Sequence, residues 1–161
     1  MTMTTPLNSD SLQSFIDTHR LAAVILPMGA HTATVGDAAR ALGVDADLII
    51  KSLVFMTGDQ PILVINNGTA RVDRKKLAAY LGMNRKRVKF ARAEQAQEVT
   101  GFVVGSMPPF GHRENLRTIV DAATAQRDIV YGGGGGIDAM MRLTSLELLK
   151  VTQAEVVDIS E

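Results

Sequence analysis

The chain has 161 residues, the usual size of one domain, with 46% hydrophobic residues and no net charge at pH 7. The hydrophobic content excludes a disordered polar chain, and the absence of cysteine excludes disulfides, thiolate zinc sites and cysteine nucleophiles. Residues 1–10 lack the basic start of a signal peptide, and the longest apolar run, 21–30, is too short to span a bilayer. We therefore expect a soluble, cytoplasmic protein.

Apolar spacing, capping residues and turn residues predict helices and strands interleaved along the chain. Thr34 with Asp37 resembles a capping box, and Gly43 and Gly82 stand where helix-ending glycines are expected. In chain order the predicted elements are a helix around 12–16, a strand at 22–26, a helix at 35–42, strands at 48–56 and 61–65, a helix at 73–82, a strand at 88–91, a helix at 93–99, strands at 116–120, 129–131 and 137–143, a helix at 144–150 and a strand at 156–159. Without a strict βαβ alternation, this order predicts one mixed α+β domain.

The charges are unevenly distributed along the chain. Residues 71–92 contain nine basic residues and one acid, Asp73, whereas the rest contains eight basic and sixteen acidic residues. An ordinary exposed face mixes the two signs, so this segment is more than a typical solvated surface. It favours a contact with a polyanion.

Lys51 interrupts a strand that is otherwise mostly apolar. Alternation places it on the same face as Ile49, Leu53 and Phe55, and the opposite face is largely apolar too. Buried lysines are rare without a partner. Lys51 therefore either extends its ammonium to the edge of the sheet or sits in a pocket for an anionic or carbonyl ligand.

Two glycine-containing segments follow later in the chain. Residues 105–112 contain two consecutive prolines between two glycines, which makes a stiff loop suited to recognising a small group, or simply a rigid connection. Residues 132–136 are five glycines that match neither the Walker loop nor the GxGxxG pattern. They indicate a flexible hairpin connection or a place where a ligand comes close.

The histidines offer no metal-ligand spacing. His19, His31 and His112 lie far apart in the sequence, and none belongs to an HxxxH pair. Ser106 does not stand in a GxSxG elbow, which argues against a serine-hydrolase triad with His112. We expect no metal and no other cofactor.

The order of these features resembles the YbaK/EbsC family, the free-standing relatives of the editing domain of prolyl-tRNA synthetase. The resemblance runs from about Thr34 to the C-terminus. It rests on ALGV at 41–44, IIKSLVF at 49–55, TGF at 100–102, GSMPPFGH at 105–112, LT at 143–144, ELL at 147–149 and VVDI at 156–159.

The resemblance implies a single editing domain over 1–161, built on a curved mixed β-sheet flanked by helices. It implies a trans-editing aminoacyl-tRNA deacylase, which hydrolyses the ester of a small mischarged amino acid, typically on proline tRNA. The family's essential lysine falls on Lys51, and its GxxxP loop falls on Gly105 and Pro109. The expected partners are aminoacylated tRNA and a synthetase, and neither a membrane nor DNA.

Two further sets of residues follow from this resemblance and from the charge pattern. The expected substrate-binding residues are Gly105, Ser106, Met107, Pro108, Pro109, Gly111, His112, Gly134 and Asp138. The expected tRNA-binding residues are Arg74, Lys75, Arg85, Lys86 and Arg87.

The sequence departs from the family pattern at two places where the aminoacyl group is expected. Ser106-Met107 stands where many relatives have Gly-Val, and five glycines with Asp138 replace a segment that is often Ala-Ala-Gly. These departures support an alternative, a non-catalytic adaptor of the same fold that binds tRNA or a synthetase. Turnover separates the two functions, since an adaptor binds without releasing amino acid.

Overall fold

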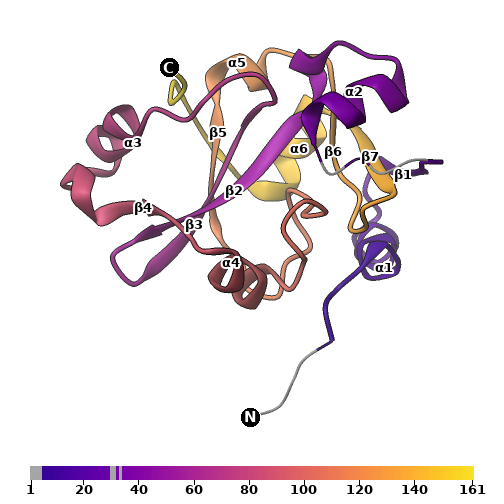
Figure 1. Cartoon of the computed structure of the whole chain (residues 1–161), viewed down its shortest axis with the longest axis horizontal. Coiled ribbons are helices and arrows are strands. Elements are labelled where there is room, and N and C mark those ends of the chain that lie inside the picture. The colour runs from indigo at the N-terminus through magenta and orange to yellow at the C-terminus, as the bar shows by residue number, and fades with distance from the viewer. Residues whose placement is uncertain (1–4, 30–31, 33) are drawn as a thin grey trace.

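The computed structural model describes residues 5–29, 32 and 34–161, and it confirms the mixed α+β class (Figure 1). The elements are α1 (Ser9–His19), β1 (Ala23–Pro27), α2 (Val35–Leu42), the 3-10 turn η1 (Ala46–Leu48), β2 (Ile50–Thr57), β3 (Gln60–Asn67), α3 (Arg74–Leu81), the 3-10 turn η2 (Arg85–Arg87), β4 (Val88–Phe90), α4 (Ala93–Thr100), β5 (Arg117–Asp121), α5 (Ala122–Ala125), β6 (Ile129–Gly133), β7 (Ala139–Thr144), α6 (Ser145–Thr152) and β8 (Glu155–Val157). His31 lies outside the described residues.

The strands form two sheets that meet at one point. A five-stranded mixed sheet has the order β4-β2-β3-β5-β8, with β3-β5 and β5-β8 parallel. A three-stranded antiparallel sheet has the order β1-β7-β6. A single parallel bridge between Ile49 and Tyr131 connects them. The expected curved sheet is therefore divided, because β2 and β6 do not continue this bridge into a ladder.

The main core lies between the two sheets. Ile50 and Val54 of β2 face it, and Val130 and Met141 of the smaller sheet pack against it from the other side. Phe55, on the opposite face of β2, packs in a second cluster with α3. Both faces of β2 are therefore covered, as its apolar sequence predicts.

Capping residues and glycines in the sequence mark where α2 begins and where α2 and α3 end. The Thr34 side chain accepts from the Asp37 amide at the start of α2, and Gly43 ends that helix at φ +67°. Gly82 ends α3 in the same conformation, at φ +66°. Such left-handed positions favour glycine because it has no Cβ. Within the described residues, no helix is long and apolar enough to cross a bilayer.

Candidate active site

Lys51 is half-buried near the start of β2, and its ammonium is fixed by the chain that follows β3. Its Nζ donates to the Ala70 carbonyl at 2.6 Å. Asn66, the cross-strand partner of Lys51, is fully buried and donates to the same carbonyl at 3.2 Å. The register of β2 with β3 and the turn at 67–70 therefore fix the direction of the Lys51 side chain.

The surroundings of Lys51 destabilise its positively charged form. Burial lowers the pKa of Lys51 below the ordinary lysine value, and the positive charge of Arg71 lowers it further. The ammonium is the form that binds an anion or a developing oxyanion. A lowered pKa means that this form is lost at a lower pH than for an exposed lysine.

We expect Arg71→Gln to raise the pKa of Lys51, because it removes one of the two causes that lower it. A ¹³C NMR titration of the Lys51 side chain measures this shift, with Arg71→Lys as the charge-conserving control. An unchanged pKa in Arg71→Gln would show that Arg71 does not act on Lys51.

A cavity of about 240 Å³ opens beside Lys51. Three separate parts of the chain meet β2 there: the start of α2, the 104–107 loop, and the hairpin formed by the end of β6 and the start of β7. The described lining residues are Thr32, Thr34, Val35, Ala38, Ile49, Ile50, Lys51, Ser52, Leu53, Val104, Gly105, Met107, Gly133 and Met140. None of them is a carboxylate or an imidazole, so Lys51 is the one ionisable group among them.

The 105–107 loop is seated on the glycine-rich end of β6. The Gly135 amide donates to the Ser106 carbonyl at 2.9 Å. A Cβ added at Gly133 would lie 2.3 Å from the Met107 carbonyl oxygen. The glycine run thus permits a backbone approach that no larger residue allows, and this approach places Gly105 and Met107 in the cavity wall.

The structure brings together only some of the predicted substrate-binding residues. Lys51, Gly105 and Met107 line the cavity. Ser106 is buried, and its hydroxyl donates to the Val103 carbonyl at 2.8 Å. Of the described residues, the other predicted ones lie outside the lining of this cavity: Pro108, Pro109, Gly111, His112, Gly134 and Asp138.

His112 and Asp138 have other surroundings. His112 Nε2 lies 2.7 Å from the Pro108 carbonyl oxygen, at a separate surface hollow that also includes Pro109 and Gly111. Burial lowers the pKa of His112, and the hydrogen bond to Pro108 acts in the opposite direction. Asp138 is exposed, and its carbonyl accepts from the Met28 amide.

Sequence reasoning missed the contribution of α2. Thr34, Val35 and Ala38 line the cavity from the first turns of that helix. The capping signal at Thr34 located the start of the helix but carried no information on which strand it faces. Among the described residues, no group of three or more His, Cys, Asp or Glu side chains could hold a metal ion.

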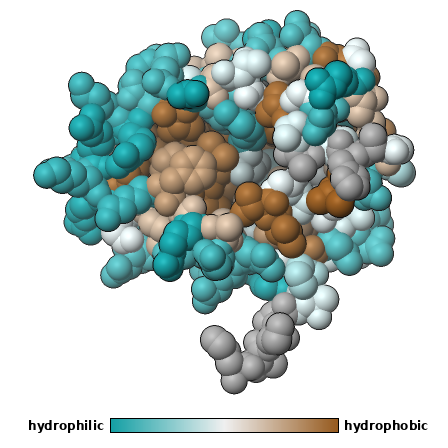
Figure 2. Space-filling model, viewed as in Figure 1, coloured by the Kyte–Doolittle hydropathy of each residue, from teal (hydrophilic) through white to brown (hydrophobic). Residues whose placement is uncertain are grey.

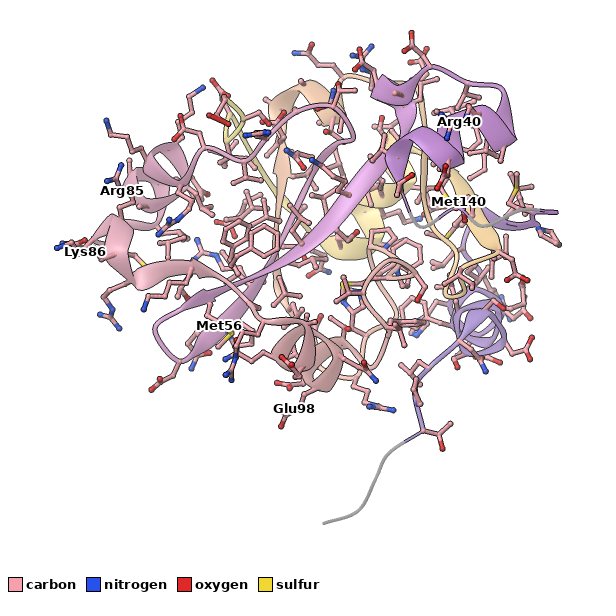
Figure 3. The ribbon with its side chains drawn as sticks, in the orientation of Figure 1. Arg40, Met56, Arg85, Lys86, Glu98 and Met140 are labelled. Atoms are coloured by element: carbon pink, nitrogen blue, oxygen red, sulfur yellow. The ribbon has the colours of Figure 1, made fainter. Side chains whose placement is uncertain are left out.

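The predicted tRNA-binding residues lie at another end of the molecule. Figure 3 shows Arg85 and Lys86 projecting outward at the left, away from Met140, which lines the Lys51 cavity. Both line a surface groove of about 650 Å³ together with Arg74 and Lys75, and we call it the basic groove. The acidic residues Asp73 and Glu161 line it too. The described lining of this groove does not include Arg87, whose carbonyl accepts from the Gly58 amide.

Comparison with known proteins identifies the family. The family model described as the aminoacyl-tRNA editing domain matches residues 29–151, most of the chain. The chain belongs to this family. A solved structure of a candidate trans-editing enzyme for prolyl tRNA synthetase superimposes on this editing domain with a TM-score of 0.86 at 31% identity, covering 95% of this chain and 96% of that one.

Other relatives of this editing domain support the same conclusion. The protein YwhH of Bacillus subtilis, described as uncharacterized, is 30% identical over 126 residues, 78% of each chain. The proline–tRNA ligase of Lactiplantibacillus plantarum is 33% identical over 88 residues, which are 55% of this chain and 15% of the ligase. The editing domain therefore matches only a small part of that much longer synthetase.

Proposed function

We propose that this chain is a trans-editing deacylase, which hydrolyses the ester between a small mischarged amino acid and tRNA, with proline tRNA as the carrier. The observation that supports it most is a half-buried lysine in a small, mostly apolar cavity. The family assignment and the similarity to a candidate trans-editing enzyme support the substrate class.

The chemistry requires little more than this cavity provides. Water adds to the ester carbonyl, and negative charge develops on the carbonyl oxygen. The bond to the ribose oxygen then breaks, and a proton lost by the water passes to that ribose oxygen, which releases the amino acid and the tRNA. An ammonium has three N–H donors, and the described structure uses one of them on Ala70. We propose that a remaining donor stabilises the developing oxyanion or fixes the terminal phosphate.

The size and stiffness of the cavity wall determine which amino acid side chains fit beside Lys51. Val35, Ala38 and Met140 give the cavity an apolar lining, and the loop bearing Met107 is seated against Gly133. Such a wall excludes large side chains by contact. It discriminates among small ones by only about 1–3 kcal/mol per methylene.

Turnover tests this function directly. The chain, at a hundredth of the substrate concentration, is expected to release many equivalents of one small amino acid from mischarged proline tRNA. Binding of the same tRNA without release would contradict the proposal and support the adaptor.

We propose that the basic groove, together with the adjacent Arg87, binds the tRNA phosphates. Arg85→Gln/Lys86→Gln/Arg87→Gln is expected to weaken tRNA binding for all sequences, because phosphate contacts carry little sequence information. It should also reduce the slope of log K against log salt by about two to three.

The matched control removes three basic side chains elsewhere, in Arg20→Gln/Arg142→Gln/Lys150→Gln. Filter binding from low to moderate salt measures both variants. Equal losses in the two variants would show that net charge, and not this groove, binds the tRNA. Arg74 is left intact because its guanidinium joins α3 to the following segment, donating to the Val88 and Arg85 carbonyls at 2.9 and 3.1 Å.

A further inference from the structure

A second hollow continues from the Lys51 cavity along β2. Its volume is about 120 Å³, and it lies between β2, β4, the start of α4 and the 104–107 loop. The two hollows have lining residues in common: Ser52, Leu53, Val104, Gly105 and Met107. The second hollow is therefore adjacent to the Lys51 cavity.

Phe90 of β4 stands at this second hollow with its ring largely in solvent. Its exposed fraction is 59%, and Val104 across the hollow is 53% exposed. The ring of Phe55, itself buried, lies behind Phe90, with centroids 4.8 Å apart and planes tilted by 48°. Phe90 is thus a fixed aromatic surface that is supported on one side and open on the other.

The charge around this surface indicates what binds there. Figure 2 shows an apolar patch over the region of β2, β3 and β4, with hydrophilic side chains along its left side. Residues 85–92, which include Phe90, carry five basic side chains and no acidic one. A nucleic acid strand offers both phosphates, which attract these positive charges, and flat bases, which stack on an aromatic ring.

We propose that Phe90 stacks on a base of the single-stranded 3′ end of the aminoacyl-tRNA, next to the terminal nucleotide whose ester lies at Lys51. This assignment rests on the proposed function. It places Phe90 between the basic groove that binds phosphates and the cavity that binds the aminoacyl group. Base stacking on an aromatic ring is tolerant of sequence, so Phe90 contributes affinity for the 3′ end and no choice among tRNAs.

Tryptophan fluorescence tests the contact without any catalysis. The chain contains no tryptophan, so Phe90→Trp introduces a single reporter at the stacking position. An uncharged acceptor minihelix ending in CCA is expected to quench this fluorescence in a saturable way. A minihelix with abasic residues in place of the two cytidines should not quench it. Leu146→Trp, on α6 with an exposed fraction of 78%, is the control and should remain unquenched by both RNAs.

Kinetics with charged minihelix give a second readout. Phe90→Ala is expected to raise KM about tenfold with little change in kcat, whereas Phe90→Tyr keeps the wild-type KM. Equal quenching by the CCA and abasic RNAs, or none by either, would overturn the stacking assignment. Binding of a synthetase at Phe90, with no quenching by RNA, would also overturn the stacking assignment. If the wild type releases no amino acid, the proposed function fails, and the fluorescence titration still decides the stacking assignment.

Discussion

Lys51→Ala is expected to lower kcat/KM for amino-acid release by at least about a hundredfold, the typical effect of removing one preorganised oxyanion donor. Lys51 is the one ionisable side chain among the described residues that line the cavity. Its removal therefore leaves no charged side chain among these described lining residues to replace it. Initial rates of release from mischarged tRNA measure the effect.

Two variants serve as controls, one that keeps the positive charge at position 51 and one that removes a different lysine. Lys51→Arg keeps the positive charge but is expected to remain poorly active, because the planar guanidinium cannot reproduce the compact ammonium bonded to Ala70. Lys89→Ala removes an exposed lysine of β4 and should release amino acid at the wild-type maximal rate. Full activity in a folded Lys51→Ala protein would remove Lys51 from the reaction.

Gly133→Ala is expected to lower kcat/KM by about a hundredfold and to destabilise the fold by about 1–3 kcal/mol. The added Cβ would lie 2.3 Å from the Met107 carbonyl oxygen and 2.9 Å from that of Ser106. Both neighbours are backbone atoms, so the whole 105–107 loop must shift to make room. That loop forms one wall of the cavity, and small displacements of a positioning group have large effects on rate.

Gly29→Ala is the control for this substitution. A Cβ at Gly29 has no neighbour within 4 Å among the described residues, so the same chemical change should affect neither rate nor stability. Thermal unfolding and release rates measure both variants. Wild-type activity in Gly133→Ala would show that the 105–107 loop can shift without affecting the reaction. The contact of this loop with Gly133 would then not position the substrate.

Much of the fold follows from local sequence signals. The apolar residues on both faces of β2 predicted a strand covered on two sides, and the two cores that flank it confirm this. The boundaries were less accurate. β3 continues through Asn66 and Asn67, beyond the predicted end at residue 65, and β7 begins at Ala139, two residues later than expected. The short helix α5 was missed because its four residues contain no apolar periodicity.

The candidate site is only partly visible in the sequence. Lys51 can be identified from the sequence because a lysine within an apolar strand is rare unless its ammonium has a partner. Its neighbours could not be found in the same way, because α2, the 104–107 loop and β6 meet β2 only through tertiary packing. Ser106 and His112 were selected because they belong to the 105–112 segment that carries the family resemblance. In the folded chain their side chains are bonded elsewhere, to the Val103 and Pro108 carbonyls.

The measurement that tests the central claim most directly is amino-acid release from a panel of mischarged proline tRNAs. The panel contains alanyl-, cysteinyl-, seryl- and threonyl-tRNA, with correctly charged prolyl-tRNA for comparison, each incubated with wild type and Lys51→Ala. We predict multiple-turnover release of one small amino acid by the wild type, loss of that release in Lys51→Ala, and little release of proline. No release from any member despite tight tRNA binding, or release that is unchanged in Lys51→Ala, would contradict an editing reaction at Lys51.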